Sequence, residues 1–255
     1  MPASNPHELV LSYTRVRTAL GLLGMALPLV LLIGGLVFEE DGLAPSISDF
    51  YHTTYRDIFV GTMIAIGVFL ISYRGYAPAE KERLPDDVLA TIAGIGAFGT
   101  AFFPNELPPH ILVAYGDLAD PIKWDAVPAT TVFQRMVGIQ YAPYFHYVFA
   151  TLFFGSLALF CFVKFARHSR VVWRRRLYLT CGWIILATLA LAFVASMLKI
   201  FGPDDAAVVV FVKSAPIIFW LEAIGVWAFG LSWLVKGKAD YRLAAMAVEL
   251  RRISR

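Results

Sequence analysis

Six long uncharged runs constrain this chain more than any other feature of its sequence. Charged residues occur in clusters, and the runs between them hold 16 to 28 residues, interrupted only by one glutamate in the last run. A helix needs about 20 apolar residues to cross a bilayer. The composition agrees, because 58% of the residues are hydrophobic and only 16% are charged. The sequence therefore predicts an integral membrane protein.

We expect an all-α fold, because helices satisfy their backbone hydrogen bonds within one segment and so suit a bilayer. The chain would form a single transmembrane domain over residues 1–255, a polytopic bundle of six transmembrane helices. Anchoring by Tyr73 and Arg74 would extend the second helix, which is the shortest. The predicted spans are about 18–38, 57–74, 87–104, 141–164, 177–198 and 216–235.

The distribution of basic residues predicts the orientation of the bundle. Of the 22 Lys and Arg residues, 17 lie before the first span, in the 74–87 and 164–176 loops, or after residue 235. Lys and Arg collect in cytoplasmic loops. We therefore expect both termini to be cytoplasmic in a multi-pass protein of the plasma (cytoplasmic or inner) membrane. The same bias accounts for the net charge of +3, so no nucleic-acid partner is indicated.

Ionisable residues concentrate in the segment PSISDFYHTTYRD (45–57), which this orientation places on the outer side. His146 lies near the outer end of the fourth predicted span, and Glu222 lies inside the sixth. Acids within membrane helices usually face the bundle interior or a polar cavity, so we expect Glu222 to pair with His146, Arg56 or Tyr141. The sequence predicts an outward-facing polar pocket with seven candidate residues: Ser48, Asp49, His52, Arg56, Asp57, His146 and Glu222.

Several of these candidates also have a purely structural interpretation. Thr54-x-x-Asp57 resembles a capping box at the start of a helix, and Asp49 could begin a turn. His146 could be an interfacial histidine whose ring is simply hydrogen-bonded. Burial without a role is less expected for Glu222, given what intramembrane acids usually mark.

The spacing Ser48-x-x-x-His52 resembles an element of the membrane hydrolase superfamily that contains alkaline ceramidases and adiponectin receptors. That resemblance implies a zinc site of three histidines with a serine and an aspartate. The family also carries a His-x3-His pair in its last helix, and the final predicted span here has no histidine. A catalytic zinc needs three protein ligands and an open position, so zinc stays a candidate cofactor with His52, His146 and Glu222 as candidate ligands.

A second resemblance covers residues 45–76 and depends on Pro45, Ile47, Ser48 and Asp49. This first outer loop, followed by a helix that ends in arginine, resembles the six-span family of damage-regulated autophagy modulators and GPI-lipid remodelling proteins. It is also similar to bacterial multi-pass proteins of unknown function. The resemblance implies association with membrane lipids and carries no agreed catalytic residues.

Three functional hypotheses follow from the sequence. In the first, the outer pocket binds or remodels membrane lipids, and Arg56 meets a lipid phosphate through charge-assisted hydrogen bonds. In the second, the protein is a metal-dependent membrane hydrolase of lipid amides or esters. In the third, it is a non-catalytic subunit of a membrane complex, with a membrane-protein partner packed on its glycine-rich helix faces.

Overall fold

The computed structural model describes residues 6–38, 42–75, 84–108, 127, 129–203 and 205–253, and these residues contain helices and no strand. The bundle is built from six long or medium helices, the fourth of which ends in a π-helical segment, η3 (Phe160–Ala166). In chain order they are α1 (Pro6–Val37), α2 (Arg56–Ile71), α3 (Asp86–Phe102), α6 (Ala142–Leu159), α7 (Val172–Phe201) and α9 (Ile217–Ile253).

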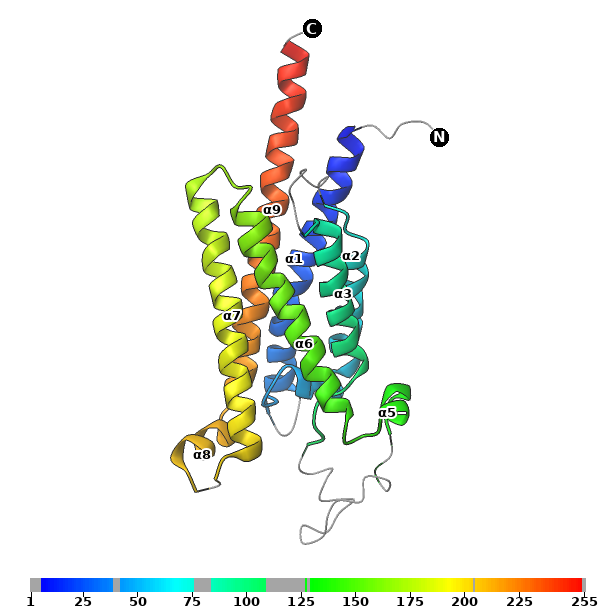
Figure 1. Ribbon diagram of the computed structural model, residues 1–255, viewed down its shortest axis with the longest axis vertical. Coiled ribbons are helices and arrows are strands. Elements are labelled where there is room, and N and C mark those ends of the chain that lie inside the picture. The colour runs from blue at the N-terminus through cyan, green and yellow to red at the C-terminus, as the bar shows by residue number, and fades with distance from the viewer. Residues whose placement is uncertain are drawn as a thin grey trace.

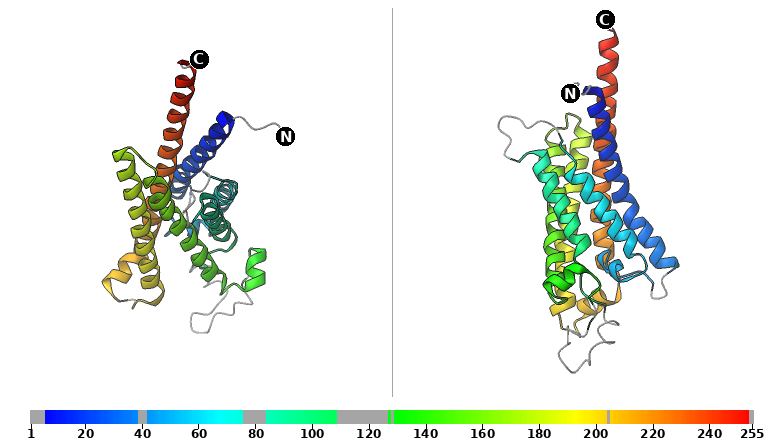
Figure 2. Two further views of the ribbon diagram at one scale, coloured as in Figure 1. Left: turned by 45° about the horizontal axis from the view of Figure 1, so that its top comes forward. Right: turned by 90° about the vertical axis from the view of Figure 1, so that its right-hand side faces the viewer.

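Three short helices lie between the long ones, all at one end of the bundle (Figure 1). They are the 3-10 helix η1 (Ser48–His52) and the α-helices α5 (Val132–Val137) and α8 (Ala207–Ser214). Helix α1 begins and helix α9 ends at the opposite end of the bundle, and α9 extends beyond its neighbours there (Figures 1 and 2). The chain therefore enters and leaves the bundle on the same side.

Within the described residues, four helices are long and apolar enough to cross a membrane, which is compatible with a multi-pass membrane protein. These spans are Thr14–Val37, Ala142–Ala166, Val172–Lys199 and Ile217–Gly237. The other two predicted spans also form helices, but α2 has 16 residues and α3 has 17. At 1.5 Å per residue each measures about 25 Å, against about 30 Å of hydrocarbon. Six full crossings therefore remain a prediction.

Glycines let α3 pack closely against helices on two sides, as the glycine-rich run 93–100 predicts. A Cβ atom added to Gly94 would lie 2.9 Å from the carbonyl oxygen of Gly67 in α2. A Cβ atom added to Gly96 would lie 2.7 Å from the backbone nitrogen of Phe153 in α6. Small residues permit this backbone approach in membrane helices, so α3 holds α2 and α6 at fixed positions.

An aromatic cluster forms the part of the hydrophobic core that lies nearer to the termini. Trp233 of α9 is fully buried and packs its ring against four aromatic neighbours, Tyr73, Phe160, Phe165 and Phe229. Cys161 and Cys181 are free and buried in helices, where a cysteine packs as a small hydrophobic residue. This packed core leaves the cavities to the other end of the molecule.

Candidate functional site

A cavity of about 660 Å³ lies where η1, the ends of α3 and α7 and the starts of α6 and α9 meet. Its wall combines polar side chains with the apolar loop that follows α1. Four of the predicted pocket residues line it, namely Ser48, Asp49, His52 and Glu222. The polar wall residues beyond these are Ser46, Thr53, Asn105, Glu106, Tyr147, Ser196 and Lys199.

The segment that carries Ser48 is docked on the first turns of α9. The backbone N–H of Ile47 donates to Glu222 Oε2 at 2.6 Å, and the backbone N–H of Phe219 donates to the carbonyl oxygen of Pro45 at 2.8 Å. Phe50 of η1 packs its ring 6.1 Å from that of Phe219. Glu222 therefore finds its partner in the backbone of the first loop.

That contact corrects the expectation that His146, Arg56 or Tyr141 would pair with Glu222. Tyr141 is 55% exposed, and the other two side chains have different partners. The expected pairing was wrong because it considered side chains alone. A folded-back loop presents backbone N–H groups to a carboxylate equally well.

His146 of α6 is buried and joins two other segments through its ring. Its Nδ1 lies 2.7 Å from the carbonyl oxygen of Phe103, and its Nε2 lies 2.9 Å from Ser48 Oγ. A carbonyl oxygen can only accept a hydrogen bond, so Nδ1 carries the proton. In the neutral ring Nε2 is then an acceptor, and the Ser48 hydroxyl donates to it.

Asp49, His52 and Asn105 form a polar cluster beside this pair. Asn105 Nδ2 donates to Asp49 Oδ1 at 2.5 Å. Among the residues that the structure describes, three buried atoms of the cluster have no hydrogen-bond partner, namely Asp49 Oδ2, His52 Nε2 and Asn105 Oδ1. Burial lowers the pKa of His52, although the charge of Asp49 and hydrogen bonding with Asn105 oppose that shift. These three atoms of the cavity wall could therefore form hydrogen bonds with a bound ligand.

Arg56 and Asp57 are not among the residues that line the cavity. The Arg56 guanidinium lies 4.6 Å from the centre of the Tyr51 ring, and its Nη2 donates to the Tyr51 hydroxyl at 3.2 Å. Asp57 is exposed in the first turn of α2. Helix α2 begins at Arg56, so its N-cap is Tyr55 in place of the expected Thr54, and Tyr55 makes no side-chain cap hydrogen bond.

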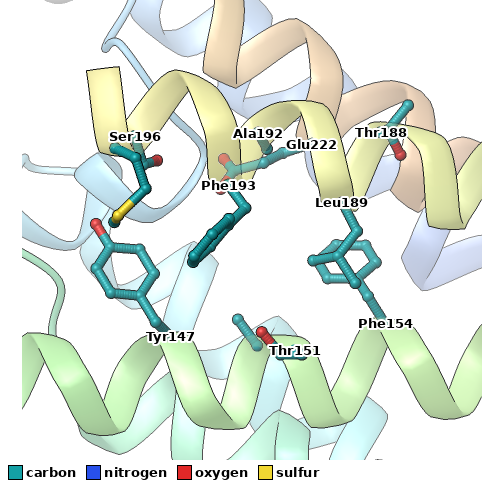
Figure 3. A pocket seen from close by; sticks show the side chains of 11 residues that line it. Tyr147, Thr151, Phe154, Thr188, Leu189, Ala192, Phe193, Ser196 and Glu222 are labelled. Carbon is teal, nitrogen blue, oxygen red and sulfur yellow. The ribbon is translucent and has the colours of Figure 1, made fainter. Parts of the chain in front are cut away.

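A second, smaller cavity of about 60 Å³ forms a groove between α6 and α7 (Figure 3). In Figure 3, Tyr147, Thr151 and Phe154 of α6 face Leu189, Phe193 and Ser196 of α7 across this groove, with Glu222 of α9 behind them. Most of its lining is apolar, and Phe193 is 57% exposed on the surface that would meet lipid. Tyr147, Ser196 and Glu222 line both cavities, so the groove and the larger cavity lie next to each other and share a wall.

Sequence reasoning missed several wall residues, including Asn105, Glu106, Tyr147 and Lys199. The Tyr147 hydroxyl donates to a carboxylate oxygen of Glu106, and this contact connects α6 to the segment after α3. Each of these residues lies at a predicted helix end on the same side as 45–57. That shared position is the signal that could have found them.

The structure does not assemble the zinc site that the spacing left open. Within the part of the chain that the structure describes, no three His, Cys, Asp or Glu side chains lie close enough to hold a metal ion. Both ring nitrogens of His146 are engaged, and Glu222 accepts from the backbone. His52, His146 and Glu222 are therefore separate members of the site and do not form a ligand set.

Comparison with protein-family models, curated proteins and solved structures found no match to this chain.

Proposed function

We propose that this multi-pass membrane protein binds a membrane lipid, with the headgroup in the polar cavity and one acyl chain in the groove between α6 and α7. The observation that carries the proposal is the shared wall of the two cavities. A cavity of about 660 Å³ with polar side chains in its wall and a smaller apolar groove share the lining residues Tyr147, Ser196 and Glu222. An amphipathic ligand matches such a pair of compartments, since each end would enter a medium of its own polarity.

The charges of the polar cavity favour a zwitterionic headgroup. Asp49, Glu106 and Glu222 are acidic wall residues, and Lys199 is basic. A phosphate would be attracted to Lys199, whereas three carboxylates favour an amine nearby. Phosphoethanolamine carries both groups. Lys199 takes the role that the sequence assigned to Arg56, whose guanidinium is held by Tyr51.

We also propose the side of the membrane from which the lipid enters the cavity. The basic residues predict cytoplasmic termini, and the cavity at the opposite end would then face the outer side of the plasma membrane. The lipid association implied by the likeness of Pro45, Ile47, Ser48 and Asp49 agrees with this function. A lipid of the outer leaflet would enter sideways through the groove.

Lipid retention in a blocked groove tests the proposal. Thr151 is exposed on the groove wall, so Thr151→Trp would fill the groove with little effect on the helix packing. Val148, one helical turn away and 64% exposed, does not line either cavity, and Val148→Trp is the matched control. Phospholipid bound to purified protein would be measured by native mass spectrometry in nanodiscs containing phosphatidylethanolamine.

We expect the wild type and Val148→Trp to retain phosphatidylethanolamine and Thr151→Trp to lose it. Equal retention by all three proteins would contradict the proposal. If the wild type retains no lipid at all, the chain has the character of the third hypothesis, a non-catalytic subunit, and a search for a membrane-protein partner becomes the next experiment.

A further inference from the structure

The contact between Ser48 and His146 has the geometry of an activated nucleophile. Ser48 Oγ lies 2.9 Å from His146 Nε2, and Ser48 lines the large cavity, where a ligand can reach it. Nucleophilic serines in acyl-transfer sites are paired with a histidine at hydrogen-bond distance, and a third group orients the histidine. The separation observed here lies within that range of about 2.6 to 3.2 Å.

The third group is also present. The carbonyl oxygen of Phe103 accepts from His146 Nδ1 at 2.7 Å, which fixes the ring in the tautomer whose Nε2 can take a proton from serine. The carboxylate of Asp49 lies close enough to the ring for electrostatic interaction. A negative charge near the ring stabilises the imidazolium that forms when His146 accepts a proton.

Burial supports a positioned pair rather than a chance surface contact. His146 is 1% exposed and Ser48 is 8% exposed. The two residues come from η1 and α6, separated by 98 positions in the chain. Docking of Pro45 and Ile47 on α9 holds the loop that carries the serine. Water access to the hydroxyl is therefore limited to the cavity side.

We propose that Ser48 and His146 form a nucleophile and base pair that cleaves a carboxylic ester of the bound lipid. The inference rests on the proposed function, because the lipid in the two cavities is the substrate. The groove meets the polar cavity at Glu222, whose carboxylate is hydrogen-bonded to Ile47, the neighbour of Ser48. A lipid with its chain in the groove would bring the ester linkage toward Ser48.

The reaction needs no component beyond the lipid and water. Ser48 Oγ attacks the ester carbonyl carbon while His146 Nε2 takes the hydroxyl proton. The tetrahedral intermediate collapses, the bond from the carbonyl carbon to the lipid alcohol oxygen breaks, and His146 returns the proton to that oxygen. Water then attacks the acyl-serine in the same manner. The products are a fatty acid and a lysolipid, and Ser48 is regenerated.

Covalent labelling with a short alkyl fluorophosphonate tests the nucleophile independently of the lipid substrate. This reagent phosphorylates activated serine hydroxyls with loss of fluoride, so one adduct would appear in the intact mass and map to the peptide with Ser48. Ser48→Ala should lose the adduct. Ser214→Ala, a control at an exposed serine of α8 that lines neither cavity, should keep it. In the His146→Gln variant, Ser48 should be labelled at least about 100-fold more slowly. This factor is the lower end of the rate enhancement that a general base usually provides.

Thermal unfolding of each variant separates loss of reactivity from loss of fold. Should His146→Gln fail to fold, the comparison of Ser48→Ala with Ser214→Ala still decides the question. An unlabelled wild type, or an adduct on any serine other than Ser48, would overturn the inference. If Ser48 only connects η1 to α6 by a hydrogen bond, its substitution could still change the unfolding temperature, but the wild type would not be labelled.

Lipid turnover completes the test. The wild type in phosphatidylethanolamine nanodiscs should release fatty acid, and Ser48→Ala should retain intact lipid without releasing it. Lipid retention without labelling would reject the dyad and leave the proposed function in place. Labelling of Ser48 without lipid retention would reject the proposed function and leave an esterase whose substrate is not a membrane lipid.

Discussion

Glu222 shows how one buried carboxylate can fix a loop. Its Oε2 accepts from the backbone N–H of Ile47 at 2.6 Å, and the loop that contains Ser48 depends on this contact. An unpartnered buried N–H group costs about 1 to 3 kcal/mol. One carboxylate oxygen of Glu222 therefore has a structural role. The same side chain also lines the cavity, where a ligand can contact it.

Two substitutions of Glu222 separate these roles. Glu222→Leu should lower the free energy of unfolding by about 1 to 3 kcal/mol, because the Ile47 N–H loses its acceptor. Glu222→Gln keeps an acceptor oxygen and should be closer to the wild type in stability, while the replacement of an acid by an amide on the cavity wall should alter the phospholipid that copurifies. Thermal unfolding in detergent and lipid mass spectrometry measure the two effects. Equal stability of both variants would exclude the hydrogen-bond role.

His52 should make stability sensitive to pH. Burial lowers the pKa of His52 below its ordinary value of 6.5, with Asp49 and Asn105 opposing the shift and Arg56 adding to it. The unfolded chain therefore binds a proton more readily than the folded protein, and stability falls as the pH drops below about 6.5. The fall ends once the pH is below the folded pKa as well.

The comparison that isolates this effect is His52→Gln, in which all other titrating groups are unchanged. Between about pH 7.5 and about pH 5 the unfolding temperature of the wild type should drop more steeply than that of the variant. Parallel curves would show that His52 is not protonated differently in the folded and unfolded states.

At the scale of elements, α3 is the helix whose position depends most directly on glycine. Gly96 faces the backbone of α6, where an added Cβ atom would lie 2.7 Å from the nitrogen of Phe153 and 2.9 Å from the oxygen of Phe149. Backbone atoms cannot rotate away as a side chain can. Phe103, whose carbonyl oxygen orients His146, directly follows α3, so the packing of this helix bears on the site.

We expect Gly96→Ala to separate α3 from α6 and to destabilise the protein by about 1 to 3 kcal/mol, the usual cost of overpacking. Gly155→Ala in α6 is the control, because an added Cβ atom there meets nothing within 4 Å. It should be neutral or stabilising by about 0.5 to 1 kcal/mol, since alanine restricts the unfolded chain. Thermal unfolding of both variants measures this, and a harmless Gly96→Ala would contradict the close packing.

At the scale of the whole molecule, the open question is whether α2 and α3 cross the membrane. If they do, the residue after α2 lies on the side of the termini and helix α5 lies on the other side. Ser72 and Val132 are both exposed and mark these two positions. The native Cys161 and Cys181 are buried. A thiol reagent should therefore label an introduced, exposed cysteine in preference to them.

We expect Ser72→Cys to react with a membrane-impermeant maleimide only from the cytoplasmic side of sealed vesicles, and Val132→Cys only from the outside. Tags at the two termini should both be cytoplasmic, as the basic loops predict. Reaction of both cysteines from the same side would leave four crossings and require α2 and α3 to form a hairpin that does not span.

The helices themselves could be predicted from the sequence. An uncharged run long enough to cross a membrane has to satisfy its backbone hydrogen bonds internally, and a helix does so within one segment. Each of the six predicted ranges contains a helix, and most predicted ends lie within a few residues of the observed ones. The exceptions are α1, which begins as early as Pro6, and α9, which extends to Ile253, both well beyond the predicted spans. The break at Gly138, with φ of 92°, separates α5 from α6 and was not visible in the apolar pattern. Periodicity reports which face is buried and is less informative about where a helix stops.

Part of the site could also be anticipated, since residues 45–57, His146 and Glu222 fall at corresponding helix ends. The sequence by itself determined a helical membrane chain with polar residues gathered toward one end, because charge and apolar length control which segments can enter a bilayer. Only the tertiary structure decided that Glu222 holds a backbone N–H, that Arg56 lies against Tyr51, and that Ser48 meets His146. Hydrogen bonds act over about 3 Å, and contacts at that range between residues 98 or 175 positions apart depend on how the helices pack.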